Sequence, residues 1–280
     1  MNNNLLYRLL KTKFGYDTFR PMQEKIICHT IDGGDSLVLM PTGGGKSLCF
    51  QISALAMDGM AVIVSPLISL MKDQVEALKA NGIAAEALNS SNDEGKNRDI
   101  INRCLEGKVK LLYISPERLV SGMMHLLQKT NVSLFAIDEA HCISSWGHDF
   151  RPEYTQLRLL RELFPSVPIM ALTATADKIT KQDILKQLNI EDAQTFIGSF
   201  DRPNLSLDVK RGYSAREKLR SIVELIRHHS GESGIIYCAT KKNVDSVYAL
   251  LLQYGIAVGR YHAGLSLEER KKNQDDFTYD

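Results

Sequence analysis

Short β-branched and apolar runs alternate with helical patterns along the whole chain. This alternation is typical of βα units that feed a mostly parallel sheet, and such a sheet needs helices on both faces. We therefore expect an α/β fold with a doubly wound parallel sheet. The expected strands are 36–40, 61–65, 84–88, 110–114, 134–138, 169–173 and 195–197. The helical patterns between them include 46–57, 67–80 and 94–105.

A second series of the same kind follows residues 200–204, where the first pattern breaks off. Here we expect strands at 205–209, 234–238 and 256–261, and helices at 215–228, 241–254 and 267–277. The sequence thus predicts two domains, a complete lobe over residues 1–205 and the N-terminal part of a second lobe over residues 206–280. Because two or three strands bury little apolar surface, we expect the second lobe to be truncated and the chain to be a fragment.

Composition excludes several classes of protein. The chain has 280 residues, 34 Lys plus Arg against 33 Asp plus Glu, and 44% hydrophobic residues, which argues against disorder and against a strongly basic surface. No apolar run approaches the roughly 18 to 20 residues that cross a bilayer, and the first residues lack the basic and apolar regions expected of a signal peptide. The five cysteines are scattered and form no C-x-x-C pair. We therefore expect no membrane partner, no zinc site and a cytoplasmic location.

The sharpest local signal is a glycine-rich turn between an expected strand and an expected helix. Such a turn points backbone N–H groups and a helix N-terminus at a phosphate. Lys46 can then reach the β- and γ-phosphates of a nucleotide, and the Ser47 hydroxyl can ligate Mg²⁺. Met40 stands where the strict G-x-x-x-x-G-K-[ST] motif has glycine, and the alternative is a turn that merely closes a strand. The candidate nucleotide-binding residues of this turn are Thr42, Gly43, Gly44, Gly45, Lys46 and Ser47.

A second signal is the pair of carboxylates that ends the strand expected at 134–138. Asp138 is expected at the carboxyl end of the sheet, where α/β proteins bind ligands, and it is suited to hold Mg²⁺. Glu139 beside it can activate the water that attacks a γ-phosphate. Taken alone, Asp-Glu after a strand is more often a helix cap, but the glycine-rich turn upstream reverses that preference. The candidate catalytic residues are therefore Lys46, Asp138 and Glu139.

With these motifs the chain resembles the superfamily 2 DExH helicases, and within them the RecQ family of DNA helicases. The resemblance implies RecA-like lobes of the P-loop NTPase type, ATP and Mg²⁺ as cofactors, and ATP-driven 3′ to 5′ unwinding in DNA repair and recombination. Residues 14–23 are similar to the adenine-recognition element of that family. The similarity implies that Tyr16 and Arg20 sandwich the base and that Gln23 bonds it bidentately.

Residues 142–154 are similar to the aromatic-rich loop with which RecQ enzymes sense single-stranded DNA. The similarity implies that Trp146 and Phe150 stack on bases and that Arg151 contacts a phosphate or the nucleotide. The alternative is a surface loop whose tryptophan packs back on the lobe. Other segments resemble the family's DNA-backbone and coupling motifs. Together, the residues assigned by resemblance to DNA binding or coupling are Ser65, Pro66, Ser115, His141, Trp146, His148, Phe150, Arg151, Thr173, Thr175 and His262.

The resemblance also sets the expected partners. They are single-stranded and duplex DNA and ATP, bound by a monomer that is nucleoid-associated if the protein is bacterial. The family's arginine-finger motif has no counterpart here, because the last arginine, Arg270, lies outside any such motif. Two alternatives stay open. One is a nucleotide- or single-stranded-DNA-binding fragment without turnover, and the other is an RNA-remodelling DExH ATPase.

Overall fold

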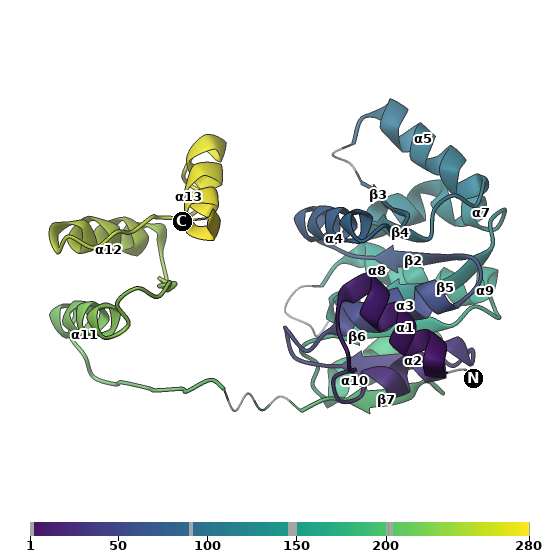
Figure 1. The fold of residues 1–280 in the computed structure, drawn as a ribbon, viewed down its shortest axis with the longest axis horizontal. Coiled ribbons are helices and arrows are strands. Elements are labelled where there is room, and N and C mark those ends of the chain that lie inside the picture. The colour runs from purple at the N-terminus through teal and green to yellow at the C-terminus, as the bar shows by residue number, and fades with distance from the viewer. Residues whose placement is uncertain (1–2, 90–91, 145–149, 200, 202–203, 280) are drawn as a thin grey trace. The chain divides into compact units, whose positions relative to one another are not determined.

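The computed structural model describes residues 3–89, 92–144, 150–199, 201 and 204–279. The chain divides into two compact units, Met1–Arg202 and Pro203–Asp280 (Figure 1). The boundary expected from the sequence lay three residues later, after residue 205.

A parallel sheet of seven strands forms the centre of the first unit, in the order β3-β4-β2-β5-β6-β1-β7 (Figure 1). Each expected strand of this unit is present, with its ends shifted by at most two residues, so the predicted α/β fold is confirmed. The strands are β1 (Ser36–Leu39), β2 (Met60–Val64), β3 (Ala85–Leu88), β4 (Leu111–Ile114), β5 (Val132–Ile137), β6 (Ile169–Thr173) and β7 (Gln194–Ile197).

Helices cover both faces of this sheet. One face carries α1 (Asn3–Phe14), α2 (Gln23–Ile31), α3 (Lys46–Ala56) and α4 (Ile68–Ala80). The other carries α5 (Glu94–Leu105), α7 (Met124–Leu127), α8 (Pro152–Thr155), α9 (Leu159–Leu163) and α10 (Lys178–Gln187). Short helical segments complete the unit: α6 (Pro116–Arg118), η1 (Leu119–Met123), η2 (Ala140–Ile143) and η3 (Gln156–Arg158).

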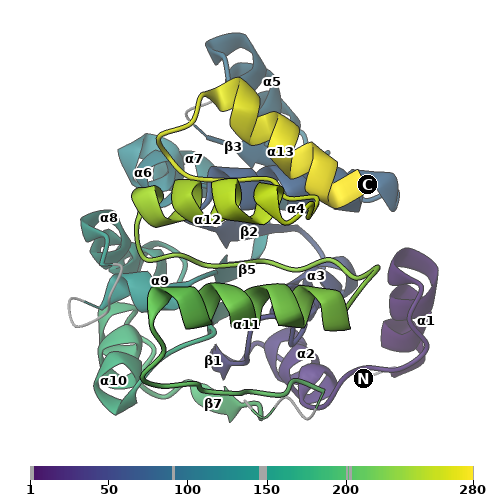
Figure 2. The same ribbon diagram turned by 90° about the vertical axis from the view of Figure 1, so that its left-hand side faces the viewer.

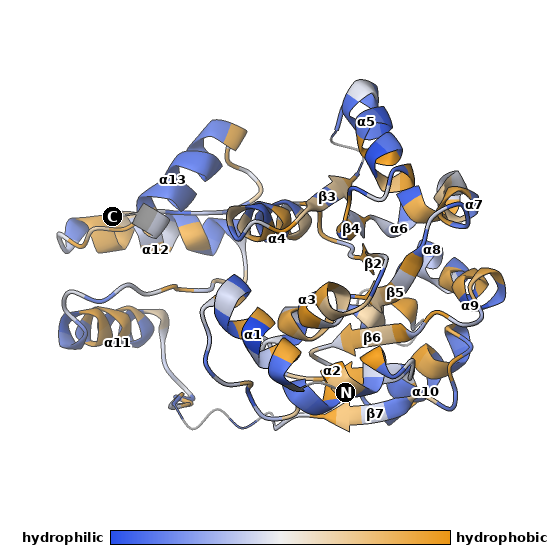
Figure 3. Ribbon diagram, turned by 45° about the vertical axis from the view of Figure 1, so that its right-hand side comes forward, coloured by the Kyte–Doolittle hydropathy of each residue, from blue (hydrophilic) through white to orange (hydrophobic). Residues whose placement is uncertain are grey.

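The two apolar layers follow from the period of two along each strand. In β1, Leu37 and Leu39 belong to the core on one face, whereas Val38 belongs to the core on the other. All four residues of β1 are buried. In Figure 3 strands such as β6 are coloured as hydrophobic, whereas the outer helix α5 is largely hydrophilic.

The second unit consists of α11 (Ala215–His228), α12 (Lys241–Gln253) and α13 (Leu267–Tyr279), joined by extended segments (Figure 2). All three helices begin where the sequence predicts. A capping box explains where α11 begins, because the Ser214 side chain accepts from the Glu217 N–H and the Glu217 side chain accepts from the Ser214 N–H. Thr240 caps α12 by accepting from Asn243 N–H.

The strands expected in the second unit are absent from its described residues, 204–279. The prediction of strands at 205–209, 234–238 and 256–261 was therefore wrong. A strand exists only where a neighbouring strand accepts its backbone hydrogen bonds, and these segments have no such neighbour within the unit. Their apolar side chains lie open instead, with Leu207 92% and Tyr237 91% exposed. In the described part of the chain, no helix combines the length and apolar character needed to cross a membrane.

Candidate functional site

The carboxyl ends of five neighbouring strands bring most of the predicted site residues of the first unit to one edge of the sheet. Along this edge the strands follow in the order β4, β2, β5, β6 and β1. Ser115 follows β4, Ser65 follows β2 and Asp138 follows β5, while Thr173 ends β6 and the glycine-rich turn follows β1. Asp138 thus lies on the strand between the two serine junctions and the elements predicted to bind a nucleotide. Open α/β sheets bind their ligands at this edge.

The turn after β1 favours glycine at three successive positions, of which Gly43 has a φ of +76°. Gly45 has a φ of +85°, and a side chain there would also place its Cβ 2.3 Å from Gln23 Nε2. A Cβ on Gly44 would lie 2.9 Å from the carbonyl oxygen of Pro41, which accepts the Gly44 N–H at 2.9 Å. The turn is therefore a narrow backbone cradle that opens directly into α3.

Lys46, the first residue of α3, folds its side chain over this cradle. Its Nζ lies 3.0 Å from the carbonyl oxygen of Met40 and 3.4 Å from that of Pro41. Ser47, half-buried, follows on the first turn of the same helix. A glycine-only cradle, an ammonium group and the N-terminus of an 11-residue helix together suit a polyphosphate.

Asp138 is buried, with 6% of its surface exposed. Its N–H donates to Val64 O at 2.8 Å, and its Oδ1 accepts the Glu139 N–H at 3.0 Å. Burial, and then the charge of Glu139, raise the pKa of this carboxyl to about 6, while the charges of Lys46 and His141 act in the opposite direction. A divalent cation would favour the ionised form strongly.

The side chains available fit Mg²⁺ bound together with phosphate. Among the residues that the structure describes, no three His, Cys, Asp or Glu side chains gather into a metal site. Mg²⁺ keeps several waters and is usually held by one or two protein ligands plus the phosphates of a substrate. Asp138 and the Ser47 hydroxyl supply that number of oxygen ligands.

Glu139 adopts a left-handed backbone conformation, with a φ of +48°. Its Oε2 lies 3.2 Å from Nδ1 of His141, and the same nitrogen lies 2.9 Å from the Thr173 hydroxyl. The Thr173 hydroxyl in turn bonds to the carbonyl oxygen of Thr175 at 3.1 Å. The structure therefore joins the end of β5 to the end of β6 through His141, Thr173 and Thr175, three of the residues assigned to coupling.

The predicted adenine-recognition residues contact the glycine-rich turn. Gln23 is only 1% exposed, and its Oε1 accepts the Arg20 N–H at 2.8 Å while its Nε2 donates to Gly45 O at 3.1 Å. The Arg20 guanidinium donates to Gly43 O. Tyr16 is 56% exposed. Both ends of the Gln23 carboxamide are thus engaged within the chain, each through one bond, which leaves the second lone pair of Oε1 and the second hydrogen of Nε2 for a bidentate bond to adenine.

Part of the aromatic-rich segment contacts residues next to the site. The Arg151 N–H donates to Cys142 O at 2.9 Å, and its guanidinium donates to Pro66 O at 3.2 Å and lies 3.9 Å from Glu117. Phe150 is 42% exposed. Arg151 thus connects this segment to the junctions that follow β2 and β4. Trp146 and His148 lie outside the described residues.

Tyr154 is a site residue to which sequence reasoning gave no role. It is fully buried, and its hydroxyl donates to the carbonyl oxygen of Asp138 at 3.1 Å. Burial raises its pKa well above the usual range. The only signal in the sequence was its place at the end of the aromatic-rich segment, because a pattern of residues cannot show which carbonyl a hydroxyl reaches.

The two serine junctions differ in how their hydroxyls are used. The Ser115 Oγ accepts the Arg118 N–H at 3.4 Å and so caps the short helix α6. The Ser65 Oγ is buried and has no hydrogen-bond partner among the described residues, although the Ser65 N–H bonds to Ile114 O at 3.1 Å. Pro66, next to Ser65, is half-buried.

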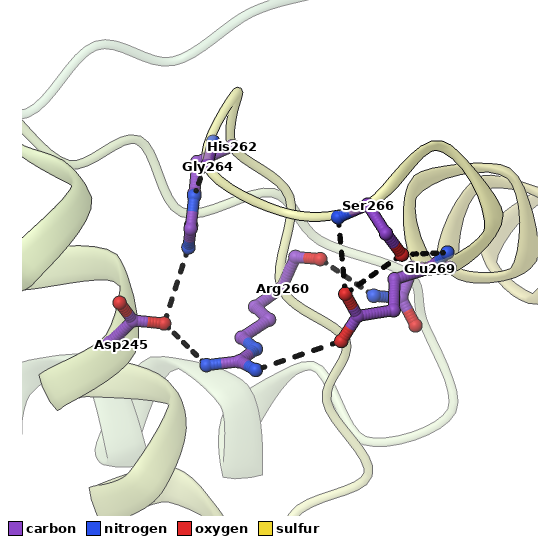
Figure 4. A network of polar contacts seen from close by, with 7 residues as sticks. Asp245, Arg260, His262, Gly264, Ser266 and Glu269 are labelled. Atoms are coloured by element: carbon purple, nitrogen blue, oxygen red, sulfur yellow. Dashed lines mark hydrogen bonds and ion pairs between the residues drawn. The ribbon is translucent and has the colours of Figure 1, made fainter.

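His262 lies in the second unit, where its ring contacts residues of that unit. Its Nε2 lies 3.2 Å from Asp245 Oδ1, and its Nδ1 accepts the Gly264 N–H at 3.1 Å (Figure 4). Sequence reasoning did not identify Asp245.

Comparison with known proteins adds three findings. The sequence matches the model of the DEAD/DEAH box helicase family over residues 20–184, and that of the helicase conserved C-terminal domain over residues 217–280. It is 48% identical to the ATP-dependent DNA helicase RecQ of Haemophilus influenzae and 45% identical to that of Bacillus subtilis, each over 97% of this chain. These alignments span 44% and 46% of the relatives, so the chain covers less than half of their length.

The fold is similar to that of a solved structure of Saccharomyces cerevisiae Dbp5 bound to Gle1 and IP6. The TM-score is 0.73, at 20% identity, and the match covers 99% of this chain and 71% of that one. At this identity the likeness concerns the fold alone.

Proposed function

Because this chain belongs to the DEAD/DEAH box helicases of the RecQ type, we propose that it binds ATP and Mg²⁺ at the glycine-rich turn after β1. In the whole protein, hydrolysis would drive movement along single-stranded DNA and opening of duplex DNA. The 3′ to 5′ direction, the role in DNA repair and recombination, the monomeric state and the cytoplasmic location belong to the same proposal.

The residues of the turn would hold the nucleotide. The backbone N–H groups of Gly43, Gly44 and Gly45 and the ammonium of Lys46 would bind phosphate oxygens. To do so, Lys46 would exchange its present bonds to Met40 O and Pro41 O for bonds to phosphate. Mg²⁺, held by Ser47 and Asp138, supplies charge neutralisation for the phosphates when bound.

Glu139 would orient and activate the attacking water. It follows the proposed metal ligand directly and has a left-handed backbone conformation, which is uncommon outside glycine and is found most often at functional sites. Its contact with His141 offers a path by which the state of the site reaches Thr173 on the next strand.

Nucleic acid would bind along the neighbouring part of the same sheet edge. Ser65, Pro66 and Ser115 lie at strand-to-helix junctions, which offer main-chain groups to a phosphate backbone. Phe150 and Trp146 would stack on bases. The Arg151 contact with Pro66 would connect this surface to the aromatic-rich segment.

The observation that carries the proposal is the position of Asp138. It stands on the strand between the serine junctions and the glycine-rich turn, and Tyr154 of the aromatic-rich segment bonds to its main chain. A nucleotide site and a nucleic-acid surface that share one strand end can influence each other over a short path.

The test is ATP hydrolysis by the 280-residue chain with single-stranded DNA, with RNA of the same sequence, and with neither. We expect hydrolysis that DNA stimulates more than RNA does. Greater stimulation by RNA would favour an RNA-remodelling ATPase, and binding of both ligands without turnover would favour a binding fragment. The first result would contradict the proposed dependence on DNA, and the second would mean that turnover needs more of the whole protein than this chain.

A further inference from the structure

A network of charged and polar side chains surrounds Arg260 in the second unit (Figure 4). Its guanidinium lies 2.5 Å from Asp245 Oδ1 on α12 and 3.9 Å from Glu269 Oε1 on α13. It also lies 5.3 Å from the centre of the Tyr248 ring, which adds a cation–π contact. Asn273 on α13 donates to the carbonyl oxygen of Arg260 at 2.8 Å. One arginine therefore connects both helices to the segment that joins them.

The same carboxylate fixes His262. Because Nδ1 of this ring accepts the Gly264 N–H at 3.1 Å, the proton of the neutral ring must sit on Nε2. Nε2 lies 3.2 Å from Asp245 Oδ1 and donates that proton to it. The bond from His262, together with that from Arg260, lowers the pKa of the Asp245 carboxyl. Both ring nitrogens are thus used within the unit, and the side chain is only 12% exposed.

The far end of the segment is held as well. Ser266 N–H and Oγ bond to Glu269 Oε2 at 3.1 and 3.0 Å, and the Glu269 N–H donates to Ser266 Oγ at 3.1 Å. This reciprocal cap starts α13. Residues 261–265 are therefore held in place at both ends, with Tyr261 56% exposed between them.

We propose that Asp245, Arg260 and His262 are positioning residues that hold the backbone of residues 261–264 in place for contact with nucleic acid. His262 braces this loop and does not bond to nucleic acid through its ring. The proposal rests on the nucleic-acid binding proposed above and assigns His262 a role different from that of a direct DNA contact.

The loop and its surroundings still offer groups that nucleic acid can use. Tyr261 is exposed, and Lys241 and Lys242 are exposed at the start of α12. The Lys241 side chain passes close to Gly264, with its Cδ 3.6 Å from the position of a Cβ there. A lysine and a helix N-terminus beside an ordered turn suit a phosphate.

A measurement of the His262 tautomer tests, without nucleic acid, whether the bond between His262 and Asp245 holds this loop in place. In the chain labelled with ¹⁵N-histidine, His262→Gln identifies the resonances of the ring among those of the seven histidines. We expect a protonated Nε2 and an unprotonated Nδ1 at neutral pH, and an Nε2 proton that exchanges faster with solvent in Asp245→Ala, because that variant removes its acceptor. A protonated Nδ1, or an Nε2 proton whose exchange Asp245→Ala leaves unchanged, would overturn the proposal.

A double-mutant cycle tests the connection to nucleic acid, with a fluorescent single-stranded oligothymidylate as the probe. Loss of the one bond between His262 and Asp245 should weaken binding by His262→Ala roughly threefold to tenfold. Asp245→Ala should weaken binding at least as much, because Asp245 also accepts from Arg260. The double variant should bind no more weakly than the weaker single variant. His262→Gln should restore part of the affinity, because its amide N–H can still reach Asp245.

Asp275→Ala is the matched control, because it removes an exposed carboxylate from α13 outside the network. We expect it to leave binding unchanged. Loss of binding in His262→Ala but not in Asp245→Ala would show a direct contact and overturn the proposal. If the unaltered chain does not bind the probe, the proposed nucleic-acid function fails, while the tautomer measurement still decides whether the brace exists.

Discussion

The hydroxyl of Tyr154 donates a 3.1 Å hydrogen bond to the main-chain carbonyl oxygen of Asp138. Tyr154 is buried on α8, at the end of the aromatic-rich segment, and Asp138 directly follows β5. The bond connects the aromatic-rich segment to the main chain of the proposed metal ligand.

Tyr154→Phe should separate the effect of the hydrogen bond to Asp138 from the effect of ring packing, because it keeps the ring and removes only the hydroxyl. A buried carbonyl left without its donor costs about 1 to 3 kcal/mol. We expect a loss of that size in urea unfolding, together with weaker stimulation of ATP hydrolysis by single-stranded DNA.

Tyr113→Phe provides the control. Tyr113 is also buried, but its hydroxyl bonds to Gln51 and Gln74 in the core between α3 and α4. We expect a similar loss of stability with stimulation unchanged. Equal stimulation in both variants would show that the Tyr154 bond has no part in coupling.

The pKa of Asp138 predicts an unusual pH dependence of stability. Its folded pKa of about 6 lies above the usual 3.8, so this group contributes stability that is fully present below pH 4 and lost as pH rises through 6. At pH 7.5 without nucleotide, the free energy of unfolding of Asp138→Asn in urea should therefore be higher than that of the unaltered chain by on the order of 3 kcal/mol. The difference should disappear below pH 4.

Asp177→Ala should change stability with the opposite dependence on pH. The Thr180 N–H at the start of α10 lowers the pKa of the Asp177 carboxyl. The contribution of Asp177 to stability is therefore present above pH 4 and lost as pH falls below that value.

An Asp138→Asn variant that is less stable than the unaltered chain at pH 7.5 would contradict the conclusion that burial raises the pKa of Asp138.

The glycine at position 45 should be irreplaceable for two reasons that can be separated. Gly45→Ala combines a left-handed backbone with a Cβ placed 2.3 Å from Gln23 Nε2. Gly33→Ala has the same backbone cost, at a φ of +87°, but no atom lies within 4 Å of its Cβ. Gly33→Ala should lose about 1 to 2 kcal/mol of stability and Gly45→Ala more, because of the added clash, whereas only Gly45→Ala should weaken binding of ADP. Equal ADP binding by the two would mean that the turn does not cradle phosphate.

Gln23 should affect phosphate binding even when no base is present. Because its carboxamide joins Arg20 N–H to Gly45 O, Gln23→Ala should loosen the turn. We expect weaker binding of both ADP and inorganic tripolyphosphate by calorimetry. Tyr16→Ala, at an exposed side chain, should weaken binding of ADP alone. If Gln23→Ala leaves tripolyphosphate binding unchanged, Gln23 acts only on the base.

The sequence predicted well those features that depend on neighbouring residues. β1, β5 and the turn at Gly45 were recognisable because strand periodicity and glycine chemistry are local. Parallel strands then bring Asp138 and Lys46 to one edge wherever the pattern holds. The same apolar pattern failed at 234–238, because a strand also requires a partner strand and none is present among the described residues 204–279.

Contacts between distant parts of the chain could not be predicted. Gln23 reaches Gly45 across 22 residues, and Arg151 reaches Pro66 across 85. Similarly, Asp245 and His262 come together only because α12 and the loop after it pack side by side. Residue types at these positions are compatible with many partners, and only the fold selects one.

The central claim is that the glycine-rich turn and Lys46 form a nucleotide-phosphate site. Calorimetric titration of the unaltered chain and of Lys46→Ala with ADP and Mg²⁺ tests it most directly. We expect one nucleotide per chain, and binding that is weaker by roughly tenfold or more in Lys46→Ala, because a charged hydrogen-bond donor is worth about 1.5 to 3 kcal/mol. Equal affinity in the two proteins would contradict the assignment of the site.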